Sequence, residues 1–182
     1  MSYLTCTDKR AVLRAYFDRY QPKVVVETGI WAGGGSCMQF AGEATVYLID
    51  CDEDNCEQAH SSCPSAVVLC GDSADVLPHL LAQLEDYVRI DEIMPALFWL
   101  DAHYVPEIDG EEHAVDHPTP LLAELQAILG WEHAARSVVL VDDLRLLGEP
   151  GWPSRAELAA LDLGETWDTQ EQADILRLTP RG

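Results

Sequence analysis

Residues 24–36 read VVVETGIWAGGGS. The stretch opens with three consecutive valines, and a β-branched run without polar alternation suits a strand that is covered on both faces. Glu27 follows the valines, and a glycine-rich turn with Gly29 and residues 33–35 comes next. This pattern predicts the first strand and turn of a parallel sheet that is covered by helices.

Four further apolar runs have the same character, at residues 46–49, 66–70, 96–100 and 138–141. The segments between them are long enough for crossover helices, which we expect over residues 38–41, 53–60, 74–84 and 120–129. The alternation of strand and helix predicts an α/β protein with a doubly wound, mostly parallel sheet.

The two ends of the chain extend this core. Residues 8–20 predict an amphipathic helix in which Val12, Ala15 and Tyr16 face inward with Leu13 beside them. Residues 154–161 predict a second helix with Ser154 as its N-cap.

The remaining segments are a hairpin and a loop. Residues 165–170 and 173–179 predict two antiparallel strands with a turn near Glu171. Residues 105–119 are polar and without periodicity, so we expect a long loop over the sheet edge.

Charge and composition exclude several function classes. The chain has 182 residues, with 32 acidic against 11 basic side chains and a formal net charge of −21. Such a surface repels phosphate backbones, so nucleic acids and anionic membranes are poor partners. No window approaches the roughly 20 apolar residues of a membrane span, and the first residues lack the features of a secretion signal. We therefore expect a cytoplasmic protein.

All six cysteines lie in the first 70 residues, and none forms a CxxC pair. That spacing disfavours a zinc ribbon or a thioredoxin-type site. We expect reduced thiols that pack as small apolar side chains, with an oxidised pair or a metal ligand as the alternative.

A carboxylate follows each of the five apolar runs: Glu27, Asp50, Asp72, Asp101 and Asp142, the last doubled by Asp143. Residues at the ends of parallel strands line the carboxyl edge of the sheet, where such folds bind ligands. For Asp72 and Ser73, capping of the next helix is an equally good interpretation. The adjacent pair Asp142 and Asp143 is different, because two neighbouring carboxylates repel unless a cation or a cluster of donors compensates.

The glycine-rich turn lacks the GxGxxG spacing of dinucleotide-binding proteins, which disfavours a nicotinamide oxidoreductase. An acid opens the turn instead. This favours a ligand that carries cationic groups and no phosphate.

With these features, residues 23–145 resemble the class I S-adenosylmethionine-dependent methyltransferases. The resemblance implies a single methyltransferase domain over residues 1–182, with an N-terminal helix in 1–21, a cofactor-binding core in 22–145 and a C-terminal helix and hairpin in 146–182. It also implies a seven-stranded sheet of order 3-2-1-4-5-7-6. The cofactor would lie against the acid and glycine-rich turn after the first strand, with Asp50 on the ribose hydroxyls and Asp72 and Ser73 at the adenine edge. The residues implied in cofactor binding are Glu27, Gly29, Gly33, Gly34, Ser36, Asp50, Asp72, Ser73 and Asp101.

Three further strings, FWLDAHY at 98–104, PLLAEL at 120–125 and VDDLR at 141–145, are similar to metal-dependent small-molecule O-methyltransferases of the macrocin and catechol kinds. This similarity implies that Asp101, Asp142 and Asp143 hold Mg²⁺. The metal would lower the pKa of an acceptor hydroxyl and orient it toward the methyl group. The acceptor would be a small molecule, and a homodimer is one option for the assembly.

One departure concerns His103, which stands where macrocin-type proteins carry a second aspartate. A neutral imidazole there is either the general base, working beside Asp101, or a residue that only orients a neighbouring acid. His113 and His117 in the polar loop either touch substrate or are solvated, and Trp31 either stacks on a ligand or does not. Two alternatives to this function are a metal-independent N-, S- or carboxyl-methyltransferase and a non-catalytic methyltransferase-like subunit.

Overall fold

The seven-stranded sheet has the order β3-β2-β1-β4-β7-β9-β8. Our computed structural model describes residues 6–31, 34–88, 96–102, 107–108, 111–112 and 119–182. Five strands run parallel, and β9 is antiparallel to both of its neighbours. Numbered along the chain, the strands of this sheet follow the order 3-2-1-4-5-7-6 that the resemblance implies. The strands are β1 (Val24–Thr28), β2 (Thr45–Asp50), β3 (Val67–Cys70), β4 (Ala96–Leu100), β7 (Val138–Val141), β8 (Trp167–Gln172) and β9 (Ile175–Pro180).

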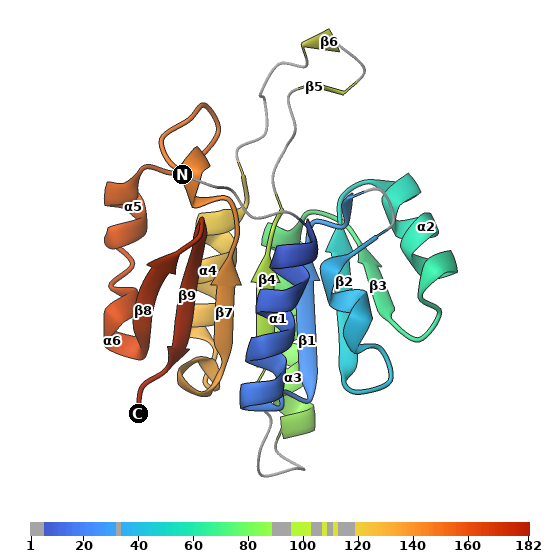
Figure 1. Cartoon of the computed structure of the whole chain (residues 1–182), viewed down its shortest axis with the longest axis horizontal. Helices are drawn as coiled ribbons and strands as arrows, with labels where there is room; N and C mark the ends of the chain where they lie inside the picture. Colours follow the sequence, from blue (N-terminus) through green and yellow to red (C-terminus); the bar gives the residue numbers. More distant parts are fainter. Residues whose placement is uncertain (1–5, 32–33, 89–95, 103–106, 109–110, 113–118) are drawn as a thin grey trace.

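Helices cover both faces of the sheet (Figure 1). The helix α1 (Cys6–Tyr20), the short 3₁₀ helix η2 (Ser36–Phe40) and α2 (Glu53–Ser62) pack on one face, while α3 (Ser73–Val88) and α4 (Leu121–Gly130) pack on the other. Because successive strand residues point to opposite faces, Phe98 belongs to one core and Trp99 to the other. Both are fully buried, as continuous apolar strands require.

The inward face of α1 differs from the prediction. Leu13 and Phe17 are the buried residues, and Phe17 stacks on Phe40 of η2 with ring centroids 4.3 Å apart. Ala15 is exposed, whereas Val12 and Tyr16 are only partly buried. Leu13 and Phe17 are four residues apart, so they lie on the same side of the helix, and this is the side that packs on the sheet.

The segment predicted as a helix over residues 38–41 is the 3₁₀ helix η2, which begins earlier, at Ser36. The chain turns back toward β2 directly after it, where Glu43 and Ala44 donate hydrogen bonds to the Phe40 carbonyl. The other predicted helices and the five predicted strands of the core are confirmed, with ends that differ by a few residues.

The C-terminal hairpin is confirmed, but its turn lies at Ala173 and Asp174 and not near Glu171, which belongs to β8. Both turn residues have positive φ (53° and 68°), as a tight two-residue hairpin turn demands. The first strand starts at Trp167 because α6 (Leu163–Thr166) takes up the preceding residues. Ser154 is the N-cap of α5 (Arg155–Ala159), as predicted, and the structure adds a complete capping box with Glu157.

Between β4 and α4, where we expected a loop, the described residues form β5 (Glu107–Ile108) and β6 (Glu111–Glu112), a small antiparallel pair at the carboxyl edge of the main sheet (Figure 1). The remaining elements are the 3₁₀ turns η3 (Ala134–Arg136) and η4 (Leu144–Leu146). Five cysteines with described side chains are free thiols, and three of them are buried. Among the described residues, no helix is long and apolar enough to cross a membrane.

Candidate functional site

The carboxyl ends of β1, β2, β4 and β7 form one edge, and backbone hydrogen bonds extend the sheet by one residue there. Gly29 donates to the Ile49 carbonyl at 2.9 Å, Asp101 to Thr28 at 3.0 Å and Asp142 to Leu100 at 3.0 Å. These bonds keep the residues after the strands in register. The acids that end the apolar runs are therefore held side by side at this edge.

The backbone conformation and the close packing at residue 29 both require glycine. Its φ is +82°, and a Cβ added there would lie 2.5 Å from the Asp101 carbonyl oxygen. The turn after β1 thus packs directly against the backbone after β4. Gly34 is different, because a Cβ on it would meet only the end of Arg10, at 4.0 Å.

Glu27 lies beneath the glycine-rich turn and is 2% exposed. Its carboxylate accepts hydrogen bonds from the backbone N–H groups of Ser36 at 2.7 Å and Cys37 at 2.8 Å, so it anchors the start of η2. Burial raises the pKa of Glu27 to about 7, although the two N–H donors oppose the shift. The structure therefore brings Glu27 and Ser36 together, with both oxygens of Glu27 bonded to the backbone of η2.

Asp50 joins the turns after β1 and β2. Its Oδ2 accepts from the Ile30 N–H at 2.5 Å, and its Oδ1 accepts from the Asp52 N–H at 2.9 Å. Asp52 itself is the N-cap of α2, where its side chain accepts from two backbone N–H groups. Asp50 is thus held at the edge by the turns after β1 and β2, and it is partly buried.

Asp72 caps the next helix, which is one of the two interpretations left open by the sequence, whereas Ser73 binds another helix. Asp72 Oδ1 accepts from the Ala74 N–H at 2.9 Å, at the start of α3. Ser73 is buried, and its hydroxyl donates to Glu124 Oε1 on α4 at 2.6 Å. Burial raises the pKa of Glu124 to about 7, against the stabilising hydrogen bond from Ser73. Sequence reasoning missed this pair, and the only signal was an acid at an inward position of an apolar helix.

Asp101, Asp142 and Asp143 come together after β4 and β7, and one oxygen of each lies within 4.8 Å of the others. Asp142 and Asp143 are 1% and 3% exposed. Asp143 adopts a left-handed conformation (φ 59°), and its N–H donates to Asp142 Oδ1 at 2.8 Å. We call these three residues the carboxylate cluster.

Two basic side chains compensate the cluster. Lys9, from α1, forms ion pairs with Asp142 Oδ2 and, at 3.2 Å, with Asp143 Oδ1. Arg145 pairs with Asp143 and with Asp174 of the C-terminal turn. The sequence showed that the aspartate pair needs compensation, but nothing in it pointed to Lys9.

The environment still disfavours charge on the aspartates. Burial and the neighbouring Asp143 raise the pKa of Asp142 to about 6, although Lys9 opposes the shift. Burial and Asp142 hold the pKa of Asp101 well above its usual range. Partial burial lowers the pKa of Lys9, but the aspartates outweigh this and raise it overall, so Lys9 is a cation at neutral pH.

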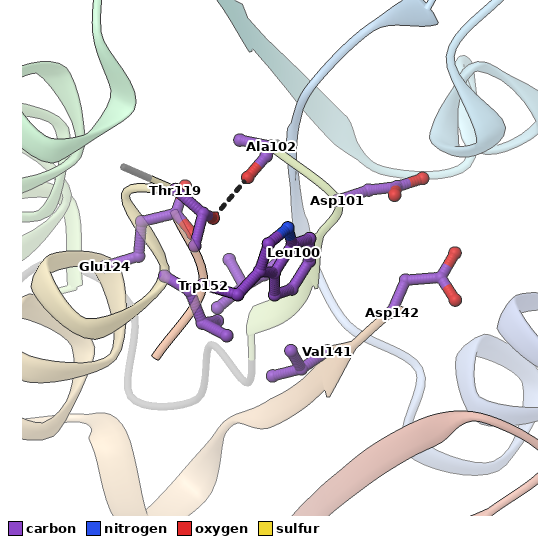
Figure 2. A pocket seen from close by; sticks show the side chains of 9 residues that line it. Leu100, Asp101, Ala102, Thr119, Glu124, Val141, Asp142 and Trp152 are labelled. Carbon is purple, nitrogen blue, oxygen red and sulfur yellow. Dashed lines mark hydrogen bonds between the residues drawn. The ribbon is translucent and has the colours of Figure 1, made fainter. Parts of the chain in front are cut away.

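A small pocket adjoins the cluster, and Figure 2 shows that the carboxylates of Asp101 and Asp142 point to one side of it, away from the apolar Leu100, Val141 and Trp152. Thr119 donates a hydrogen bond to the Ala102 carbonyl at 2.8 Å across this pocket. Trp31, beside the glycine-rich turn, is 66% exposed. His103, Gly33, His113 and His117 lie outside the described residues.

The cluster fits a divalent cation by the chemistry of its donors. Carboxylate oxygens are the ligands that Mg²⁺ and Mn²⁺ prefer, and three of them converge here. Two of the three carboxylates are already paired with Lys9. A metal ion and the Lys9 ammonium would therefore use the same oxygens.

No protein-family model matches the chain, and no curated protein matches it. Solved structures do. A TehB-like SAM-dependent methyltransferase from Corynebacterium glutamicum has a TM-score of 0.54 at 11% identity, over 95% of this chain and 87% of that one. A proposed caffeoyl-CoA O-methyltransferase from Staphylococcus aureus has a TM-score of 0.58 at 15% identity, over 96% and 83%.

The N-methyltransferase NodS from Bradyrhizobium japonicum has a TM-score of 0.57 at 10% identity, over 96% of each chain. At such low identities the similarity concerns the fold alone. The names of the last two proteins also indicate different acceptor atoms, oxygen in one and nitrogen in the other. The chain therefore has the fold of the class I S-adenosylmethionine-dependent methyltransferases.

Proposed function

We propose that this protein is a cytoplasmic enzyme that transfers a methyl group from S-adenosylmethionine to a hydroxyl of a small molecule. The observation that carries the proposal is the carboxyl edge of a methyltransferase sheet, where Glu27, Asp50 and the carboxylate cluster are held in register. The acids of this edge would attract a cationic, phosphate-free cofactor, although Glu27 is buried and already accepts hydrogen bonds from the backbone of η2.

For the cofactor, Glu27 and the turn through Gly29, Gly33 and Gly34 to Ser36 would bind the methionine part. Asp50 would accept hydrogen bonds from both ribose hydroxyls, since its two oxygens lie at the end of β2. Asp72 and Ser73 lie where the adenine edge is expected, but their side chains already cap α3 and bind Glu124.

For the acceptor, we place the hydroxyl at the carboxylate cluster. The hydroxyl oxygen attacks the methyl carbon, the carbon–sulfur bond breaks with its electrons moving to sulfur, and the proton leaves to a base. Asp101 and His103 are the candidate bases. Mg²⁺ held by Asp101, Asp142 and Asp143 would supply a Lewis acid that lowers the pKa of the hydroxyl.

A titration and an assay test the proposal. S-adenosylhomocysteine should bind the purified protein with micromolar affinity by calorimetry, and methyl transfer to catechol-like or sugar hydroxyls should be detected with a labelled methyl donor. Absence of binding at millimolar ligand would favour a non-catalytic subunit. Transfer to nitrogen, sulfur or a carboxylate that EDTA leaves unchanged would favour the metal-independent alternative.

A further inference from the structure

Lys9 contacts two of the three residues of the carboxylate cluster, although it comes from the first half of α1. Its side chain is 19% exposed, whereas those of Asp142 and Asp143 are 1% and 5% exposed. The lysine is therefore the more exposed partner in each of these ion pairs. Lys9 is also one of only two lysines in the chain, the other being Lys23.

The two basic partners of the cluster are held differently. Arg145 is fixed between Asp143 and Asp174, so its guanidinium has a second carboxylate outside the cluster. The ion pairs that the structure shows for Lys9 are both with the cluster itself. If another cation arrives, Lys9 is the partner that it displaces.

The anchoring of α1 allows Lys9 to leave without undocking the helix. The buried contacts of α1 lie further along, at Leu13 and Phe17. Arg14 pairs with Glu43, and Arg10 donates to the Gly34 carbonyl at 3.1 Å. The lysine side chain is flexible and 19% exposed, so its release toward solvent needs no movement of these anchors.

We propose that Lys9 is the resident cation of the carboxylate cluster. Its ammonium group pairs with Asp142 and Asp143 in place of a divalent metal ion and competes with that ion for their oxygens. This inference rests on the cation site of the proposed function. A metal ion at the cluster and the ion pairs of Lys9 then exclude each other, because they use the same carboxylate oxygens. The protein is then stable without metal, and the metal has to displace an internal ammonium.

The first test uses the wild-type protein and an amine-reactive acylating reagent, with both lysines followed by peptide mass spectrometry. Lys23 is exposed and serves as the internal reference. Without metal, Lys9 should react more slowly than Lys23. Saturating Mn²⁺ at constant ionic strength should accelerate labelling of Lys9 at least about threefold and leave Lys23 unchanged, because exposure of Lys9 then follows site occupancy. Labelling of Lys9 that stays constant while Mn²⁺ binds would overturn the proposal.

The second test measures Mn²⁺ affinity by calorimetry in Lys9→Met, in Lys23→Met and in the triple variant Lys9→Met/Asp142→Asn/Asp143→Asn. Lys9→Met should bind Mn²⁺ at least about tenfold more tightly than the wild type, since a competing charge in contact with the ligands is gone. Lys23→Met carries the same change in net charge and should bind as the wild type does. The triple variant should lose the site.

Equal Mn²⁺ affinity in Lys9→Met and wild type, or equal gains in both lysine variants, would contradict competition at the cluster. Titration with S-adenosylhomocysteine in parallel separates this failure from that of the proposed function. A protein that binds the nucleoside but shows no effect of Lys9 keeps the methyltransferase proposal and loses this one.

Discussion

Lys9 Nζ lies 3.2 Å from Asp143 Oδ1, although 134 residues separate them in the chain. The contact ties the N-terminal helix to the end of β7 and compensates a pair of adjacent buried aspartates. Since both aspartates are nearly inaccessible to water, their ionised forms need stabilisation by basic side chains such as Lys9.

Lys9→Met should destabilise the protein when metal is absent. The substitution keeps the length of the side chain but leaves Asp142 and Asp143 with one cation fewer, and we expect a loss of about 1–3 kcal/mol, discounted for the partial exposure of Lys9. Urea unfolding in EDTA measures it. Adding Asp142→Asn should recover part of the loss, and an equal loss in the presence and absence of that second change would show that the charges do not interact.

Asp50→Asn should weaken binding of S-adenosylhomocysteine by about 1.5–3 kcal/mol, since a charged acceptor for two hydroxyls is lost. Asp52→Asn is the matched control, because it removes the same charge next to the site and asparagine caps α2 as well as aspartate does. The thermal midpoint without ligand shows whether each variant is folded. Unchanged affinity in folded Asp50→Asn would remove Asp50 from the ribose site.

Gly29→Ala should destabilise the fold by more than Gly42→Ala. Both glycines have positive φ (82° and 94°), so both substitutions carry a backbone cost of about 1 kcal/mol. Only at Gly29 would the new Cβ also meet backbone, 2.5 Å from the Asp101 oxygen, whereas nothing lies within 4 Å at Gly42. Equal unfolding free energies for the two variants would show that the turn moves away from β4 at little cost.

Glu124→Gln should change how stability depends on pH. Burial raises the pKa of Glu124 to about 7 in the folded protein, so the folded state binds more protons than the unfolded state between about pH 4.5 and 7. Its contribution therefore destabilises the wild type as pH rises through this range. The glutamine keeps an acceptor for Ser73 and removes the titration.

Urea unfolding at pH 5 and at pH 8 should thus show Glu124→Gln gaining up to about 3 kcal/mol relative to the wild type at the higher pH. Glu165→Gln is the control, because Glu165 is exposed, and this variant should show no such gain in unfolding free energy at pH 8. A wild type and a Glu124→Gln variant whose stabilities run parallel from pH 5 to 8 would mean that Glu124 stays ionised when folded.

The sheet and its acidic edge could be predicted from the sequence. Five continuous apolar runs encode its parallel strands, and every residue of β1, β4 and β7 is buried, as expected for strands that are covered on both faces. The same expectation was wrong for β3, because this strand lies at the edge of the sheet and leaves Val67 and Cys70 exposed. Because Glu27, Asp50, Asp101 and Asp142 directly follow these runs, their place at the edge follows from chain connectivity and parallel packing alone. The roles of His103 and Gly33 stay predictions.

Long-range partners were decided only by the tertiary structure. The contacts of Lys9 with Asp143 and of Ser73 with Glu124 join residues 134 and 51 positions apart, and a charged residue on a helix has no local signal for its partner. The buried face of α1 likewise depends on what it covers, so that Leu13 and Phe17 face inward and Ala15 does not. Local pattern determines which elements form, but which side chains meet depends on how those elements pack.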